Sequence, residues 1–203
     1  SKPQPKSQTM SRGDDGWFTA DIAGVTAGTR YKYRIDGEID VPDPASAFQP
    51  EDVFGPSELI DHDHYAWRAA DWRGRPWQDT VLIETHVGTF TKEGSYRAMI
   101  DKLDHLVATG ITALELMPLA DFAGHRNWGY DGVLWYAPDS AYGRPDDLKY
   151  LIDEAHRRGL MVFLDVVYNH FGPEGNYLGS YAPSFFTDAQ TPWGSAIDYR
   201  VPQ

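Results

Sequence analysis

The stretch DDLKYLIDEAHRRGLMVFLDVVYNH, residues 146–170, contains a helix pattern followed at once by a strand pattern. Its first half repeats apolar residues at helical spacing and stops at Gly159, and glycine commonly follows the last turn of a helix. Its second half, LMVFLDVV at 160–167, is apolar on both faces, which is typical of a buried parallel strand. The stretch therefore predicts a helix that returns the chain to a parallel sheet.

The same order occurs earlier in the chain. VLIETHVG at 81–88 is predicted as a strand, SYRAMIDKLDHLVATG at 95–110 as a helix, and ITALELMP at 111–118 as the next strand. A β-α-β-α-β order with right-handed crossovers leaves two α/β folds, a (β/α)8 barrel or a doubly wound sheet. Three predicted strands cannot close a barrel, so a barrel would be present only in part.

The first 70 residues indicate β structure of another kind. Residues 1–13 are polar and are expected to be a loose end. WFTADIAG at 17–24 and TRYKYRID at 29–36 are predicted to pair as a hairpin with one buried face, and Asp36-Gly37 supplies a turn. The four prolines of 41–58 exclude a helix and predict an irregular segment. Because a hairpin alone is marginally stable, this region is interpreted as part of a β-sandwich.

Composition limits the classes of partner. The 203 residues carry a formal net charge of -12, so we expect no binding to nucleic acid or to an acidic membrane surface. The chain has no cysteine and no apolar stretch near the roughly 20 residues that span a bilayer, so a cytoplasmic location is the default expectation. Seven Trp and twelve Tyr suit carbohydrate as well as a core.

The long connection at 119–145 is the first place to expect a ligand, because sites in α/β folds follow the carboxyl ends of strands. Its polar and aromatic residues are Asp121, His125, Arg126, Asn127, Trp128, Tyr130 and Asp131.

Three acidic positions in the predicted strands leave two interpretations open. Glu84 and His86 lie two residues apart, so in a regular strand they share a face. They could contact a substrate, but a structural pair that orders the strand end is preferred, and Glu115 is treated alike. Asp165 and His170 could form a site if the strand ends near Val167, or could be a paired carboxylate and a surface histidine.

Cofactor and metal motifs are weak or missing in the sequence. Neither HxxxH nor a calcium-loop spacing occurs, and Asp165 with Asn169 would supply at most two of the six or more oxygen ligands that calcium takes. The glycines do not form GxGxxG or a phosphate loop. We therefore expect neither a metal nor a cofactor.

Several segments resemble a known family. FLDVVYNH at 163–170 resembles the first conserved region of the α-amylase superfamily, glycoside hydrolase family 13, and residues 127–160 resemble the segment before it in branching and debranching enzymes. More narrowly, five segments resemble the trehalose-releasing branch of the superfamily, namely 41–58, 84–96, 113–132, 165–178 and 181–198. The similarity runs from Trp17 to Asp198.

The resemblance implies a fold and an activity. We expect part of a β-sandwich domain of the E-set or immunoglobulin-like type at 1–75, followed at 76–203 by the first three strands of a (β/α)8 (TIM) barrel. Members of the branch are glycosidases that hydrolyse the α-1,4 bond next to the terminal trehalose unit of maltooligosyl trehalose, with retention through two carboxyl groups about 5 Å apart. The nucleophile Asp and the acid Glu are expected beyond Gln203, so this chain alone is expected to be inactive.

The resemblance also assigns substrate-binding roles. Tyr130 corresponds to the tyrosine that stacks on the sugar ring next to the cleaved bond, and His170 to the histidine that hydrogen-bonds a hydroxyl of that sugar. Asp165 corresponds to a buried aspartate that organises the site. Trp128, Asp131 and Glu174 are candidates for the pocket rim. Asn169 corresponds to a calcium ligand in many α-amylases, but the trehalose-releasing branch resembles calcium-free members, so no metal is assigned.

Two other functions remain open at this stage. A branching or debranching enzyme shares NWGY at 127–130 but acts on α-1,6 linkages, whereas FGPEGNYL at 171–178 favours the trehalose-releasing branch. The chain alone could also be an inert or weakly glucan-binding piece. Because an open barrel leaves apolar strands uncovered, we expect self-association or a partner that completes the sheet.

Overall fold

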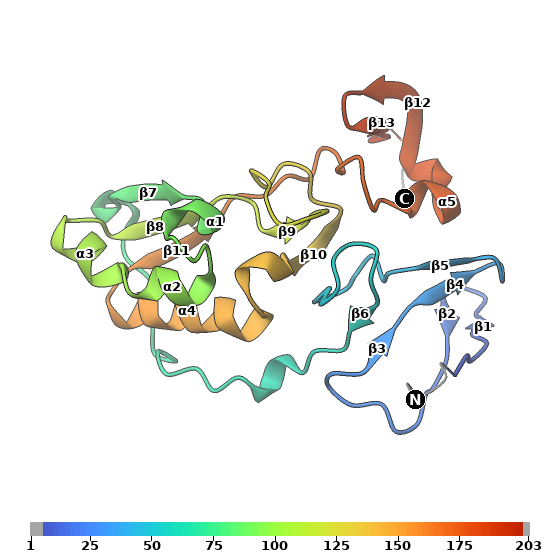
Figure 1. Ribbon diagram of the computed structural model, residues 1–203, viewed down its shortest axis with the longest axis horizontal. Coiled ribbons are helices and arrows are strands. Elements are labelled where there is room, and N and C mark those ends of the chain that lie inside the picture. Colours follow the sequence, from blue (N-terminus) through green and yellow to red (C-terminus); the bar gives the residue numbers. More distant parts are fainter. Residues whose placement is uncertain (1–5, 201–203) are drawn as a thin grey trace.

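A computed structural model describes residues 6–200, and its centre is a parallel sheet of three strands (Figure 1). The strands, with β8 between the other two, are β7 (Leu82–Thr85), β8 (Ala113–Leu116) and β11 (Met161–Leu164). Leu82, Ala113 and Met161 share one register position across the sheet. The predicted β-α-β-α-β order and the parallel sheet are confirmed.

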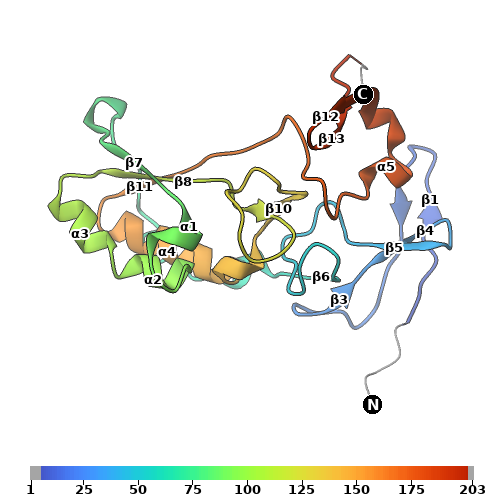
Figure 2. The same ribbon diagram turned by 45° about the horizontal axis from the view of Figure 1, so that its top comes forward.

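Three helices cover one face of this sheet (Figure 2), and they are α2 (Tyr96–Ile100), α3 (Leu103–Ala108) and α4 (Pro145–Arg157). The sequence predicts one helix over 95–110, but the structure interrupts it at Asp101 and Lys102. The Lys102 N–H donates to the Met99 carbonyl at 2.9 Å, which makes a tighter turn than an α-helix. This turn keeps Met99 and Leu103, both 0% exposed, in the core.

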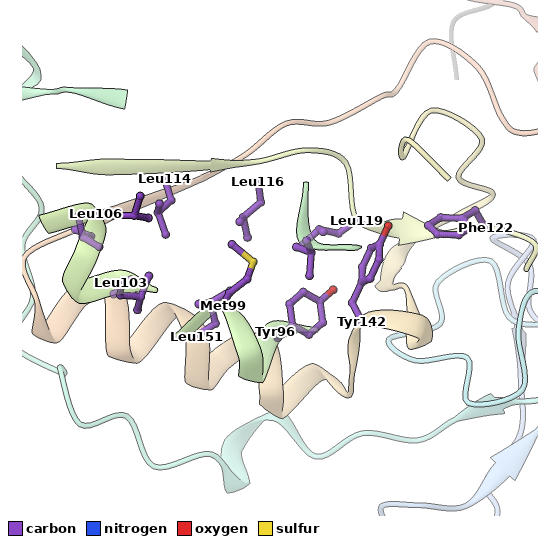
Figure 3. Packing of buried hydrophobic residues seen from close by; sticks show 13 residues of the cluster. Tyr96, Met99, Leu103, Leu106, Leu114, Leu116, Leu119, Phe122, Tyr142 and Leu151 are labelled. Carbon is purple, nitrogen blue, oxygen red and sulfur yellow. The ribbon is translucent and has the colours of Figure 1, made fainter. Parts of the chain in front are cut away.

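The main hydrophobic core lies between the sheet and these helices (Figure 3). Leu114 and Leu116 of β8 point toward side chains of the three helices, among them Met99, Leu103 and Leu151. Each such side chain contributes about 1.5–3 kcal/mol by leaving water. The central strand is therefore fixed by its apolar contacts, and the loops at its carboxyl end start from a rigid base.

The other side of the sheet is open (Figure 2). On the outer strands Leu82 is 42%, Phe163 36% and Leu164 52% exposed. Trp77, in the short 3-10 helix η2 (Trp77–Asp79), packs edge-on against Phe163 with ring centroids 6.2 Å apart. The expectation of strands buried on both faces holds for β8 but is wrong for β7 and β11, because little of the described chain covers their outer sides.

Short antiparallel pairs precede the sheet, and they are β1 (Ser11–Arg12) with β2 (Phe18–Thr19), β3 (Arg30–Tyr31) with β6 (Ser57–Glu58), and β4 (Tyr33–Ile35) with β5 (Ile39–Val41). The predicted pairing of 17–24 with 29–36 is therefore wrong, since each run pairs with a different segment. The Asp36-Gly37 turn is confirmed, and its positive φ angles of 51° and 79° join β4 to β5. Residues 1–5 of the expected loose end lie outside the described residues, and the rest of it includes β1.

The proline-rich segment at 41–58 is irregular but well packed. Phe48 and Val53 are buried, and the Ser57 hydroxyl donates to the side-chain oxygen of buried Gln49 at 2.6 Å. Arg144 at the start of α4 forms an ion pair with Glu58. The segment therefore connects the antiparallel pairs to the helical layer.

The remaining elements follow the same chain order. They are η1 (His62–His64), α1 (Val87–Phe90), β9 (Ala120–Asp121), β10 (Leu134–Pro138), η3 (Ser140–Tyr142), α5 (Leu178–Tyr181), η4 (Pro183–Phe185), β12 (Phe186–Thr191) and β13 (Gly194–Ile197). β12 and β13 form an antiparallel pair beside α5 (Figure 1). None of the helices within residues 6–200 is long and apolar enough to cross a bilayer.

Asp153 of α4 holds the connecting segment that leads to the sheet. Its carboxylate, which is 0% exposed, accepts hydrogen bonds from the backbone N–H groups of Ala69 at 2.8 Å and Arg68 at 3.1 Å, and from Tyr65 Oη at 3.3 Å. Burial alone would raise the pKa of Asp153, but the two backbone N–H groups and the Arg68 guanidinium outweigh it and hold the pKa below its ordinary value. The carboxylate is therefore charged in the folded protein at neutral pH.

We expect Asp153→Ala to lower the free energy of unfolding by about 2 kcal/mol, because two backbone N–H groups lose their acceptor. Urea unfolding at pH 7 measures the change. Since the pKa of Asp153 is lowered by folding, the stability that it contributes is present at neutral pH and is lost as the pH falls through the acidic range.

Asp146→Ala on the same helix is the matched control. Its carboxylate is 54% exposed and pairs with Lys149 at 3.1 Å, and such surface pairs are worth less than about 1 kcal/mol. Equal losses in the two variants would contradict the special role of Asp153.

Candidate functional site

The long connection at 119–145 is not a plain loop. β9 pairs antiparallel with β10, and the Val133 N–H donates to the Asp121 carbonyl at 2.9 Å. The Asp139 carboxylate then accepts from the backbone N–H groups of Phe122 at 3.1 Å and Ala141 at 2.8 Å. These bonds close a rigid loop over 122–132, which carries most of the predicted site residues.

The structure brings Tyr130 and His170 together. His170 Nε2 lies 2.8 Å from the Tyr130 carbonyl oxygen. Because a carbonyl oxygen only accepts, Nε2 carries the hydrogen, and Nδ1 is left for another partner. β11 ends at Leu164, earlier than the predicted end near Val167, and the irregular backbone after it lets His170 turn toward the loop. The interpretation of Asp165 and His170 as separate strand faces no longer applies.

Two glycines allow the backbones to cross closely here. The Gly172 N–H donates to the Gly132 carbonyl at 3.1 Å, and a Cβ on Gly172 would lie 1.9 Å from the Asp131 carbonyl oxygen. Gly129 has φ +99°, and a Cβ there would lie 2.4 Å from the Pro118 carbonyl oxygen. The Tyr130 backbone is therefore held between two close contacts that larger residues could not make.

Asp165 is the first residue after β11, and its N–H donates to the Leu116 carbonyl at 2.9 Å. Its carboxylate is half-buried, and it makes no hydrogen bond with any other described residue. The expectation of a paired carboxylate is therefore wrong, because the group keeps contact with solvent. Asp165 lines a cavity of about 30 Å³ together with Gly129, Gly132 and Trp135. The cavity lies beneath the backbone that flanks Tyr130.

The other predicted contacts differ in how firmly they are held. Asp131 accepts from Asn127 Nδ2 at 2.7 Å. Trp128 is 78% and Tyr130 37% exposed, so both rings are open to a ligand. Glu174 is exposed, and no hydrogen bond or ion pair within the described residues joins its side chain to this group. The structure thus gathers Trp128, Tyr130, Asp131 and Asp165 close to His170, and Glu174 less closely.

Glu84 and His86 do not form the preferred structural pair. β7 ends at Thr85, so His86 lies in the connection to α1, and its Nε2 lies 2.6 Å from the Asn127 carbonyl oxygen. Glu84 is exposed and lies in register with Glu115 on the open side of the sheet. The assumption that the strand continued to 88 produced the error.

Two buried acids lie behind the loop. Asp121 is 0% and Asp139 2% exposed, and Asp121 Oδ2 is buried without a hydrogen-bond partner. Burial, and then the charge of Asp139, raise the pKa of Asp121 to about 9. Burial also raises the pKa of Asp139 to about 6, against the opposing effect of its two backbone N–H donors. Asp121 is therefore neutral in the folded protein near pH 7.

The arrangement suits a sugar. Exposed aromatic rings fit the apolar faces of pyranose rings, and side-chain hydrogen-bonding groups fit the hydroxyls. Trp193, which the sequence reasoning missed, stacks on His170 with ring centroids 4.5 Å apart and is 41% exposed. Its only sequence signal is the aromatic residue within TPWG at 191–194. No three His, Asp or Glu side chains in residues 6–200 gather as a metal site would require.

Comparisons with known proteins agree with this description. Residues 56–190 match the family described as alpha amylase, catalytic domain. The chain is 54% identical over 179 residues to malto-oligosyltrehalose trehalohydrolase of Deinococcus radiodurans, covering 88% of this chain and 30% of that protein. It is 47% identical over 190 residues to the enzyme of the same name from Saccharolobus solfataricus, covering 94% of this chain and 34% of that protein.

A solved structure is also similar. The crystal structure of a Salmonella typhimurium protein, named as a candidate alpha amylase, superposes with a TM-score of 0.91 at 55% identity. The match covers 96% of this chain and 33% of that one. The chain therefore spans about a third of the length of the relatives that it matches.

We expect Asp121→Asn to stabilise the protein at pH 8 more than at pH 4. An aspartate in the unfolded chain ionises near pH 4, about 3.9 in model peptides, whereas folding raises the pKa of Asp121 to about 9. Stability therefore falls as the pH rises between these values, and asparagine removes this slope. Melting temperatures at the two pH values measure the effect. Asp101→Asn, at an exposed position, is the control, and an equal shift at both pH values would refute the prediction.

Proposed function

The chain belongs to the alpha-amylase catalytic-domain family, and from this premise we propose that it supplies part of the sugar pocket of a glycosidase that releases trehalose. The bond to be hydrolysed is the α-1,4 linkage next to the terminal trehalose unit of maltooligosyl trehalose. The contact between His170 Nε2 and the Tyr130 carbonyl supports the proposal most directly, because it joins the two segments that carry the sugar contacts. The names of the two similar enzymes support the choice of substrate.

Each side chain has a proposed task in this pocket. The Tyr130 ring stacks on the sugar next to the cleaved bond, where an apolar ring face fits the C–H side of glucose. His170 uses Nδ1 for a sugar hydroxyl, because Nε2 already donates to the Tyr130 carbonyl. Asp165 organises the backbone beside the cavity. Trp128, Asp131 and Glu174 form the rim.

Bond cleavage needs two further carboxyl groups in the proposed mechanism. A retaining glycosidase uses a nucleophile and an acid about 5 Å apart. We assign both to later strands of a complete barrel, after β11, as the family resemblance implies. The residues described above then act only by binding, by orienting the sugar and by limiting water at the pocket. Neither a metal nor a cofactor enters this proposal.

The domain division is also a proposal. We place the boundary near residue 75, with a partial β-sandwich of the E-set type at 1–75 and the beginning of the barrel at 76–203. The antiparallel pairing of β1 to β6 and the start of the parallel sheet at Leu82 support it. A cytoplasmic location remains a prediction.

The first test uses a longer protein that includes this chain and the later strands. We expect it to release trehalose from maltooligosyl trehalose, with the products measured by chromatography. Tyr130→Ala should lower kcat/KM at least tenfold, equivalent to about 1.4 kcal/mol. Tyr136→Ala is the matched control, because Tyr136 is 71% exposed on nearby β10.

Two outcomes would contradict the proposal. Absence of trehalose among the products, with cleavage or transfer at α-1,6 branch points instead, would favour a branching or debranching enzyme. Hydrolysis by the 203-residue chain alone would refute the assignment of both catalytic carboxyl groups to later strands. Titration of this chain with maltooligosaccharides, followed by tryptophan fluorescence, would separate weak glucan binding from an inert piece.

Self-association of the isolated chain is a separate proposal. Leu82, Phe163 and Leu164 remain exposed on the outer strands, and such edges pair readily with other chains. We expect oligomers in size-exclusion chromatography with light scattering. A monodisperse monomer at micromolar concentration would contradict this expectation.

A further inference from the structure

His86 contacts the loop that carries the proposed sugar contacts. It lies between the end of β7 at Thr85 and the start of α1 at Val87. Its Nε2 is 2.6 Å from the Asn127 carbonyl oxygen. Since that oxygen can only accept, Nε2 must carry a hydrogen. The histidine therefore donates to the backbone of the loop.

The imidazole ring is held in one orientation. Tyr142 packs edge-on against it, with ring centroids 6.0 Å apart, and the Tyr142 hydroxyl lies 3.5 Å from Nε2. On another side, a Cβ built on Gly88 would lie 3.0 Å from His86 Cε1, so the backbone of α1 is close to the ring. His86 Nδ1 is buried without a hydrogen-bond partner in the described chain. The bond to Asn127 is therefore the main polar contact of this ring.

Asn127 extends the connection into the loop through its side chain. Its Nδ2 donates to Asp131 Oδ2 at 2.7 Å, and its Oδ1 accepts from the Gly129 N–H at 2.8 Å. These two bonds enclose Trp128 and Tyr130 in the sequence. The backbone of Asn127 is thus fixed by His86, and its side chain fixes the residues on both sides of the exposed rings.

We propose that His86 is a positioning residue for sugar binding, which acts through Asn127 to hold Trp128, Tyr130 and Asp131 in place. The ligand is the α-linked glucose unit that stacks on Tyr130, and this part of the inference rests on the proposed function. His86 is not a catalytic residue, since its ring is turned to the Asn127 carbonyl and is enclosed by Tyr142 and Gly88. Its effect on the sugar passes through the loop.

Variants of the longer protein test this role. His86→Leu keeps an apolar side chain but has no donor, and we expect KM for maltooligosyl trehalose to rise at least tenfold while kcat changes less than threefold. His86→Gln places an amide N–H near the former Nε2, and we expect it to recover most of the lost affinity. His105→Leu, on the exposed side of α3, is the matched control and should leave KM within twofold.

A second variant guards against loss of folding. Asn127→Ala leaves the backbone carbonyl for His86 but removes the bonds to Asp131 and Gly129. It should raise KM by a similar factor, and the double variant with His86→Leu should be little worse than either single variant. A KM for His86→Leu within twofold of the parent value, or a glutamine variant no better than leucine, would overturn the inference.

A readout without turnover separates this inference from the proposed function. In the 203-residue chain labelled with ¹⁵N-histidine, NMR should show a protonated Nε2 and a bare Nδ1 for the His86 ring. Amide exchange of Gly129 should quicken at least tenfold in His86→Leu and recover in His86→Gln. If these signals appear but the longer protein releases no trehalose, the proposed substrate fails and the positioning role stands. If they are absent, the positioning role fails whatever the activity.

Discussion

The parallel arrangement of β7, β8 and β11 is the constraint on which the rest of the structure depends. In a parallel sheet all carboxyl ends lie at one edge, so the segments that leave the three strands start close together. The helices that make this possible bury one side of the sheet, and β8 is packed most tightly because it has a strand on each side. The segments after β7, β8 and β11 supply His86, Tyr130 and His170, which meet at that edge.

Backbone contacts rather than side-chain pairs hold the three segments together. His86 and His170 both direct a ring nitrogen to a carbonyl oxygen of the same loop, at Asn127 and at Tyr130. Gly129 and Gly172 permit approaches that any Cβ would prevent. Carbonyl oxygens are present at every position whatever the side chain, so the loop is held without using the groups that a sugar would need.

Sequence patterns predicted the parts of the fold that have a strong period. The strands at 81–88, 111–118 and 160–167 and helix α4 were found because long apolar repeats decide such elements. The pairing of 17–24 with 29–36 was predicted wrongly, because strands of two or three residues carry too little pattern to select a partner. The break at Asp101 follows from packing against the sheet, which no local signal records.

The site was predicted in part for a similar reason. The resemblance indicated Tyr130 and His170, and the structure places them in contact through backbone atoms. The role of Asn127 could not be predicted, since it depends on which carbonyl and N–H groups the folded loop brings near. Asp165 was expected to be paired, because sequence alone cannot say where the strand ends and solvent begins. Trp193 became relevant only through its stacking on a histidine twenty-three residues earlier.

The buried Asp121 also changes how the charge of the chain should be counted. The formal value of -12 treats every carboxyl group as ionised. With a pKa of about 9, Asp121 keeps its hydrogen at neutral pH in the folded protein, whereas in the unfolded chain it gives it up. The folded protein is therefore about one unit less negative than its composition implies, and folding at pH 7 takes up a proton from the buffer.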